Sequence, residues 1–121
     1  MKKVIKGGKV ATATDVFEAD LLIEDGVITQ IAKKIDVADA EVIDASGKYV
    51  MPGGIDPHTH LDMPFNNTVT DDDWESGTIA AAFGGTTTIL DFCLSAGETK
   101  LADAVAKWHT KAQGKAVIDY G

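Results

Sequence analysis

The sequence predicts an α/β protein in two parts, an all-β segment over residues 1–51 and alternating strands and helices over residues 52–121. Two observations support this division. Asp25-Gly26 separates two strand-like runs, which is the strongest short-range signal for a β-hairpin. After Pro52, β-branched stretches alternate with segments of helical periodicity. Strand–helix–strand order at this spacing indicates right-handed βαβ units and a parallel sheet.

Short apolar stretches separated by turn residues are expected to form the strands of the first segment. Gly7-Gly8 is expected to turn the chain between the first two strands, and residues 45–48 separate the last two. The expected strands cover residues 4–6, 9–11, 20–24, 27–31, 41–44 and 49–51.

The second segment opens with a strand over residues 54–56 that leads to a pair of histidines, and residues 61–70 are expected to form a loop. A helix is expected over residues 74–83, because Thr70 and the aspartates at 71–73 suit a helix N-terminus and Gly84-Gly85 suits its end. The remaining elements are a strand over residues 86–92, a helix over 101–111 with apolar residues 101, 102, 104, 105 and 108 on one face, and a strand over 116–120.

Composition and charge exclude some classes of function. Hydrophobic content of 45% and charged content of 25% are typical of a soluble globular protein. The net charge of −8 argues against nucleic acid and anionic membranes as partners. No apolar run approaches the length of a membrane span, and none follows the basic start as in a secretory signal. The single Cys93 cannot form an intrachain disulfide, which favours a reducing, cytoplasmic location.

The most informative stretch runs from Val50 to His60, where an apolar segment leaves a turn and ends in His58-Thr59-His60. On an extended backbone, residues i and i+2 point to the same side, so both imidazoles can reach one metal ion or one substrate. Neutral imidazole is a common ligand for zinc and similar metals. The alternative is a pair of strand-end histidines whose hydrogen bonds are satisfied by backbone or water.

The residues around the histidines resemble a known family. Residues 52–60 read Pro-Gly-Gly-Ile-Asp-Pro-His-Thr-His and look like the first-strand metal motif of the cyclic amidohydrolases, within the amidohydrolase superfamily. The continuation Leu-Asp-Met-Pro-Phe narrows the resemblance to the dihydropyrimidinase, or D-hydantoinase, branch. Residues 22–28, 75–78, 80–88 and 91–93 are also similar to that branch, so the resemblance covers essentially the whole chain.

This resemblance implies a TIM (β/α)8 barrel preceded by part of a small β-sandwich. Such a barrel typically needs about 250 residues, and the chain has 121. We therefore expect a truncated, N-terminal portion of a longer protein. Residues 1–51 would be the N-terminal part of the β-sandwich, and residues 52–121 the first β/α units of the catalytic barrel. The isolated chain is expected to be inactive and poorly soluble.

The resemblance also implies the chemistry. His58 and His60 would bind one of two divalent metal ions, zinc being the expected metal, bridged by a carboxylated lysine beyond Gly121. A hydroxide between the metals would open the cyclic amide of a dihydropyrimidine or hydantoin to give an N-carbamoyl amino acid. The implied catalytic aspartate also lies beyond Gly121, so no catalytic residue is expected within the chain. The implied assembly is a homotetramer, and the implied partner is a small cyclic amide or ureide.

The residues after His60 bear on substrate choice. Dihydroorotases resemble one another in an arginine two positions after the second histidine, where this chain has Asp62. An aspartate would repel a carboxylate, so a dihydroorotate-like acid is a poor substrate. Met63 and Phe65 either form an apolar wall around the ring substituent or anchor the loop against a neighbouring helix. Asn66-Asn67 stand where many relatives carry glycine, and asparagine tolerates left-handed backbone.

The other polar candidates have simpler alternatives. Asp56 either orients a metal-binding histidine or makes a strand-end hydrogen bond. Asp91 and Cys93 lie near the expected mouth of the site, and Cys93 is expected to be an inert packed thiol. His109 is expected on a solvated helix face, and the aspartates at 71–73 need no metal.

Two other functions remain open at this point. One is an allantoinase-like cyclic amidohydrolase. The other is a non-catalytic scaffold built on the same fold, against which the presence of both His58 and His60 argues.

Overall fold

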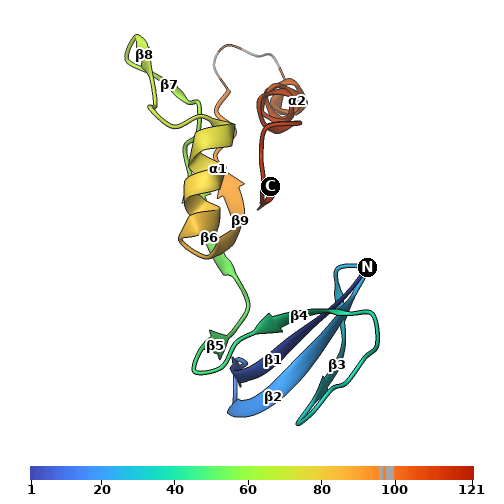
Figure 1. Cartoon of the computed structure of the whole chain (residues 1–121). Helices are drawn as coiled ribbons and strands as arrows, with labels where there is room; N and C mark the ends of the chain where they lie inside the picture. Colours follow the sequence, from blue (N-terminus) through green and yellow to red (C-terminus); the bar gives the residue numbers. More distant parts are fainter. Residues whose placement is uncertain (96, 98–99) are drawn as a thin grey trace. The chain divides into compact units, whose positions relative to one another are not determined.

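The computed structural model describes residues 1–95, 97 and 100–121. The chain divides into two compact units, Met1–Pro52 and Gly53–Gly121, and Figure 1 shows the elements of each. The first unit contains β1 (Lys2–Ala11), β2 (Val16–Glu24), β3 (Val27–Ala32), β4 (Glu41–Asp44) and β5 (Tyr49–Val50). The strand order is β3-β2-β1-β4, with β5 also pairing with β1. None of the described helices is long and apolar enough to span a membrane.

The predicted hairpin is confirmed. Strands β2 and β3 pair antiparallel on either side of Asp25 and Gly26. Their φ angles are 49° and 85°, and two consecutive positive φ values are what a type I′ turn requires. Strands β4 and β5 instead run parallel to β1, so the sheet is mixed.

The turn predicted at Gly7-Gly8 is wrong. Strand β1 continues through these residues, and its pairing with β2 shifts register between Ile5 and Gly8. Gly7 has a φ of 71°, which is the local geometry of a β-bulge rather than a chain reversal. The two strands predicted over residues 4–6 and 9–11 are therefore one strand with an irregularity at its centre.

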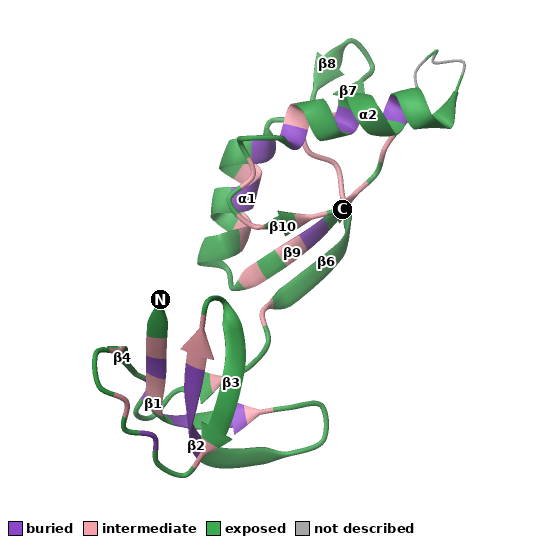
Figure 2. Cartoon of the chain, turned by 90° about the vertical axis from the view of Figure 1, so that its right-hand side faces the viewer, coloured by how far each residue is buried: buried purple, intermediate pink, exposed green. Residues whose placement is uncertain are grey.

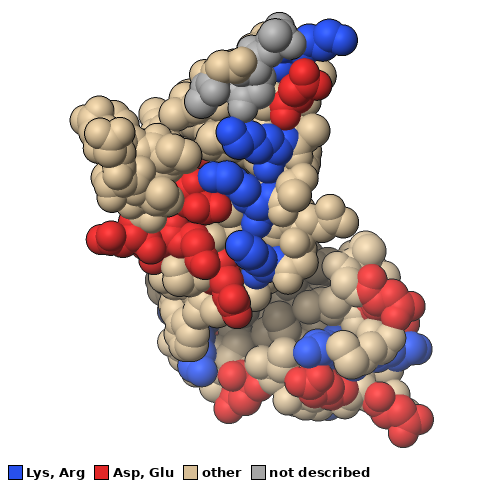
Figure 3. Space-filling view, turned by 90° about the horizontal axis from the view of Figure 1, so that it is seen from above, with Lys and Arg blue, Asp and Glu red and all other residues tan. Residues whose placement is uncertain are grey.

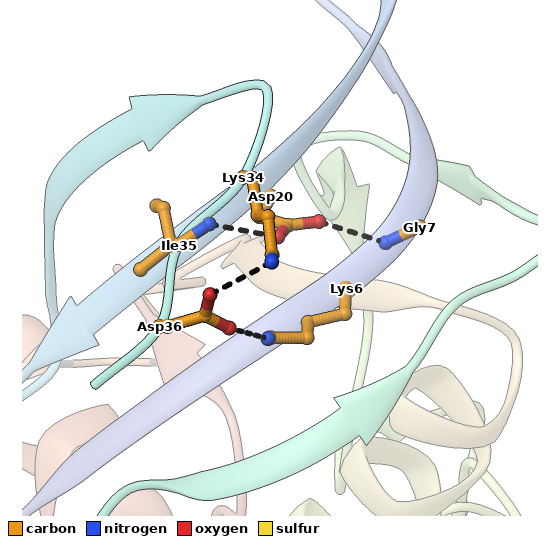
Figure 4. Close-up of polar contacts among 6 residues, drawn as sticks. All are labelled: Lys6, Gly7, Asp20, Lys34, Ile35 and Asp36. Atoms are coloured by element: carbon orange, nitrogen blue, oxygen red, sulfur yellow. Dashed lines mark hydrogen bonds and ion pairs between the residues drawn. The ribbon is translucent and has the colours of Figure 1, made fainter. Parts of the chain in front are cut away.

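A buried carboxylate holds this irregularity in place (Figure 4). Asp20 is 7% exposed, and its Oδ1 accepts a hydrogen bond from Gly7 N at 3.0 Å. Its Oδ2 accepts from Ile35 N, also at 3.0 Å. These two backbone N–H groups hold the pKa of Asp20 below its ordinary value, the Gly7 bond having the larger effect. The carboxylate thus ties the bulge of β1 to the segment that follows β3.

The sheet of the first unit buries apolar residues on both of its faces. Figure 2 shows the buried stretch in β2, where Leu21 and Leu22 are neighbours in sequence and therefore point to opposite faces. Leu22 packs in a cluster with Val4 and Ile35. Leu21 packs in a second cluster with Val10 and Ala19.

The second unit is a parallel sheet with two helices. Strands β6 (Gly54–Thr59), β9 (Thr86–Asp91) and β10 (Asp119–Tyr120) lie in the order β10-β9-β6, and both pairings are parallel. Helix α1 (Trp74–Phe83) connects β6 to β9, and α2 (Leu101–Ala112) precedes β10. The predicted strand–helix alternation is confirmed. The strand predicted over residues 116–120 is shorter than expected, because only its last residues pair with β9.

Helix α1 has the predicted bounds, and Asp73 is its N-cap. The Asp73 carboxylate accepts hydrogen bonds from Glu75 N at 2.9 Å and Ser76 N at 2.8 Å, while the Ser76 hydroxyl accepts from Asp73 N. This reciprocal pair is a capping box. The aspartate run therefore begins the helix, as expected from the sequence.

Two other details of this unit differ from the prediction. Residues 61–70 contain a small hairpin, β7 (Pro64–Phe65) and β8 (Thr68–Val69), rather than an irregular loop. Its turn residues Asn66 and Asn67 have φ angles of 45° and 66°, so they adopt the left-handed backbone considered for them. On α2, the apolar face predicted from the sequence is only partly buried, because Leu101 is 80% exposed and Val105 is 46% exposed.

The core of the second unit lies between its sheet and its helices. Trp74, Ile89, Trp108 and Ala112 form the buried cluster. Figure 3 shows several basic side chains gathered in one strip, with acidic side chains gathered in a second strip beside it.

Candidate metal centre

The two histidines lie at the carboxyl end of β6, the first strand of the parallel sheet. His58 is within the strand and exposed, and His60 follows it and is half-buried. Their Nε2 atoms are 3.1 Å apart, and the ring centroids are 5.0 Å apart in an edge-on arrangement. The same-side geometry expected from the His-x-His spacing is therefore present, and both ring nitrogens point to one place.

This geometry fits a divalent metal. Two nitrogens that each lie 2.0–2.1 Å from a tetrahedral zinc ion are about 3.3 Å apart, close to the observed 3.1 Å. Within the described residues, no group of three or more His, Cys, Asp or Glu side chains could hold a metal. The His60 Nδ1 atom is buried, and no described residue forms a hydrogen bond with it. The pair thus supplies two nitrogen donors, fewer than a metal ion needs.

Phe92 covers one side of the histidine pair. It follows β9 directly, and its ring stacks on His58 with centroids 4.2 Å apart. The same ring is tilted against His60, at 5.4 Å. Phe92 was not among the predicted site residues, although its position just past a strand end next to β6 was a usable signal.

Asp91 is the last residue of β9, and its carboxylate accepts hydrogen bonds from the two residues that flank His60. Its Oδ2 accepts hydrogen bonds from Thr59 Oγ1 at 2.9 Å and from Leu61 N at 2.8 Å. Its Oδ1 accepts from Trp108 Nε1 at 2.8 Å. The sequence placed Asp91 near the mouth of the site but gave no sign of these partners, because they come from two segments far from Asp91 in the chain.

Asp56 makes the simpler of the two contacts considered for it. Its Oδ1 accepts a hydrogen bond from His58 N at 3.1 Å. The carboxylate therefore bonds the backbone within β6, at the register shift that leads into the His-x-His segment.

Met63 and Phe65 differ in their surroundings. Met63 is half-buried and packs against the cluster that contains Trp74, which fits the loop-anchor alternative. Its backbone N–H also donates to Thr70 Oγ1 at 2.9 Å. Phe65 is 59% exposed on the β7–β8 hairpin, which fits a residue that contacts a ligand.

The remaining candidate residues pack in the core, lie on the surface or cap a helix. Cys93 is half-buried and packs against the core of the second unit. His109 is exposed on α2 with its ring centroid 6.1 Å from that of Tyr120. Asp73 caps α1, and Asp72 Oδ1 accepts a hydrogen bond from the Ser76 hydroxyl.

A pair of imidazoles that converge at the carboxyl end of a parallel sheet lies where α/β enzymes carry their active sites. The sequence matches the amidohydrolase family over residues 41–118. The chain belongs to this family.

Individual relatives agree with this assignment. The chain is 67% identical to a D-hydantoinase of Geobacillus stearothermophilus over all 121 residues, which are 26% of that protein. It matches a crystal structure of a D-hydantoinase with a TM-score of 0.97 and 64% identity, covering 100% of this chain and 26% of the other. A crystal structure of a dihydropyrimidinase from Brevibacillus agri matches with a TM-score of 0.96 and 59% identity, at the same coverage. The chain thus spans about a quarter of the length of the relatives it matches.

Proposed function

We propose that this chain is part of a metal-dependent cyclic amidase that opens hydantoin or dihydropyrimidine rings to N-carbamoyl amino acids. The observation that carries the proposal is the 3.1 Å approach of His58 Nε2 to His60 Nε2 at the carboxyl end of β6. The identity to D-hydantoinases over the whole chain supports this substrate class over the allantoinase-like alternative.

The proposed metal ligands within the chain are His58 and His60. When bound, a divalent metal supplies Lewis-acid polarisation of the ring carbonyl and acidifies a water molecule. We propose two such ions, with zinc as the metal, and a carboxylated lysine outside these 121 residues as the group between them. Each imidazole must present an unprotonated Nε2 atom to act as a ligand.

The rest of the unit positions these ligands and shapes the substrate site. Phe92 restricts the orientations of both imidazoles and keeps one side of the pair apolar. Phe65 is carried on a hairpin that leaves the carboxyl end of β6, and we propose that it contacts the substituent of the substrate ring. Met63, the other proposed substrate residue, acts on substrate choice chiefly by anchoring that hairpin.

We also propose the larger fold to which each unit belongs. Gly53–Gly121 would supply the first β/α units of a TIM barrel, as its parallel order supports. Met1–Pro52 would be one share of a β-sandwich. An apolar hollow of about 470 Å³ on its sheet supports this, with Ile5, Leu21 and Ile28 among its lining residues. A homotetramer in the cytoplasm completes the proposal, the location resting on the single half-buried thiol.

The test replaces each of the chain's histidines in the full-length protein. His58→Ala and His60→Ala should each lower the metal content and abolish the ring opening of hydantoin and dihydrouracil. His109→Ala is the matched control, because this histidine is exposed on α2, and it should keep metal and activity.

Metal content is measured by elemental analysis, and ring opening by the appearance of the N-carbamoyl product. Allantoin, assayed in parallel, separates the alternative substrate class. Unchanged metal and turnover in His58→Ala would refute the ligand assignment. A wild-type protein without turnover on any of the three rings would favour the scaffold.

A further inference from the structure

The pairing of β6 with β9 shifts register between Asp56 and Thr59 and ends at Thr59, one residue before the second histidine. The last backbone contact between β6 and the chain after β9 is the hydrogen bond from Phe92 N to Thr59 O, at 3.1 Å. His60 lies beyond it, outside the strand. The backbone at His60 therefore needs another support if its imidazole is to stay 3.1 Å from that of His58.

The carboxylate of Asp91 provides this support on both sides of His60. One oxygen, Oδ2, accepts from the hydroxyl of the residue before it and from the backbone N–H of the residue after it. Two attachments that flank one residue fix its main-chain position and limit the directions of its side chain. Because ionised carboxylates accept shorter and stronger hydrogen bonds than neutral groups, one side chain can hold both attachments.

Helix α2 holds the carboxylate in turn. Trp108 is 6% exposed, and its Nε1 donates to Asp91 Oδ1 at 2.8 Å. The buried indole cannot move without disturbing the core, so it fixes the carboxylate plane. One turn later, Lys111 lies 4.8 Å from the centre of the Trp108 ring. Its Nζ contacts the backbone oxygen of Asp62 and lies 3.4 Å from that residue's Oδ2.

We propose that Asp91 is a positioning residue for the histidine pair, and that Trp108 sets its orientation. The proposal rests on the proposed function, in which His58 and His60 bind a metal. In this proposal, Trp108 of α2 holds Asp91, and Asp91 holds the backbone on either side of His60. The Nε2 atoms of His58 and His60 then stay close to one point. The competing interpretation is a structural tie between strand and helix without effect on the metal.

Three variants of the full-length protein separate these interpretations. Asp91→Asn keeps the size but offers one acceptor oxygen, so its NH2 group must face an N–H donor on one side. Trp108→Phe removes the donor to Oδ1 together with part of a buried ring, and Thr59→Val replaces the hydroxyl, which also contacts Leu90 O at 3.3 Å, with a methyl group. Asp103→Asn is the control, because it removes the same charge from an exposed position on α2.

The readouts are metal affinity, measured by competition with a chelator, and the visible absorption spectrum of the Co²⁺-loaded protein, which reports ligand geometry. Melting temperature is measured alongside. Asp91→Asn should weaken the binding of Zn²⁺ by about 10- to 100-fold, the range found when the hydrogen-bond partners of metal ligands are removed. It should also change the Co²⁺ spectrum. Trp108→Phe and Thr59→Val should change affinity and spectrum in the same direction by a smaller factor, and Asp103→Asn should change neither.

Several outcomes would overturn the proposal. One is an Asp91→Asn protein that melts at a lower temperature but keeps wild-type Zn²⁺ affinity and Co²⁺ spectrum. If Asp91→Asn does not fold, the proposal is overturned when Trp108→Phe and Thr59→Val both keep the wild-type Zn²⁺ affinity and Co²⁺ spectrum. If His58→Ala loses metal while Asp91→Asn does not, the proposed function stands and the positioning role fails. If the wild-type protein binds no metal, both fail.

Discussion

The imidazole of His58 and the phenyl ring of Phe92 are stacked, with their centroids 4.2 Å apart and their planes inclined by 28°. His58 lies in β6, and Phe92 directly follows β9, the parallel neighbour of β6; the backbone hydrogen bond from Phe92 N to Thr59 O fixes their relative height. A ring held in this way restricts the rotation of the imidazole before any ligand is present.

This stacking leads to the first prediction. Phe92→Leu keeps an apolar side chain but removes the aromatic face, and aromatic pairs of this kind are worth about 0.5–1.5 kcal/mol. We therefore expect the dissociation constant for Zn²⁺ to rise by about 2- to 10-fold. Phe83→Leu is the control, because Phe83 is 91% exposed on α1. Equal Zn²⁺ affinities in the two variants, measured by chelator competition, would show that the ring has no role in orienting His58.

The second prediction concerns Phe65 and Met63. Phe65→Ala should change the relative kcat/KM values for hydantoins with different 5-substituents by about 10- to 200-fold, the usual range for a few carbons in an apolar pocket. Met63→Ala should instead lower the free energy of unfolding by about 1–2 kcal/mol, because Met63 packs against the core. Kinetics with substituted and unsubstituted hydantoin, together with thermal melts, provide the measurement. Uniform scaling of all substrates in Phe65→Ala would assign that residue to loop anchoring as well.

The third prediction concerns Asp20 and acid. Hydrogen bonds from Gly7 N and Ile35 N lower the pKa of Asp20 in the folded protein. Its stabilising contribution is therefore complete above the unfolded-state pKa of about 3.9, and it is lost as the pH falls through the lower, folded-state value. Asp20→Asn leaves one buried N–H facing a donor, so we expect a loss of about 1–3 kcal/mol at neutral pH.

Hydrogen exchange at the Gly7 and Ile35 amides, expressed as protection relative to the unfolded chain, measures this effect locally. Protection should fall in Asp20→Asn at neutral pH, and the difference from wild type should shrink as wild-type Asp20 becomes protonated. Wild-type protection in the variant at neutral pH would contradict the role given to the carboxylate. Asp39→Asn is a suitable control, since Asp39 has a φ of 62° and asparagine tolerates that conformation.

The elements that the sequence predicted well are those with local signals. Helix α1 begins and ends as predicted, because its N-cap, Asp73, and its stop, Gly84-Gly85, lie within a turn of the helix they bound. The Asp25-Gly26 hairpin follows from the φ values that these two residues tolerate.

The errors arise where distant partners decide the structure. Gly7-Gly8 looks like a turn in sequence, but pairing with β2 and the Asp20 carboxylate turn it into a bulge. The periodicity of α2 placed Leu101 and Val105 on the buried face, yet the contacts that bury Trp108 and Ala112 leave both exposed. For the site, the spacing of His58 and His60 sufficed to predict convergence, whereas Asp91 acquires its partners only when β6, β9 and α2 meet.

At the end of β6 and in the residue that follows it, three consecutive side chains alternate in direction and have different partners. His58 and His60 converge on one point, and Thr59 between them is attached to Asp91. A substitution at one of these positions changes one side chain and leaves the other two on their own sides of the backbone. A one-residue insertion or deletion within β6 would instead rotate all three side chains to the opposite face at once. Variation at this strand among descendants of the gene should therefore consist of replacements, with gaps confined to the hairpin that follows.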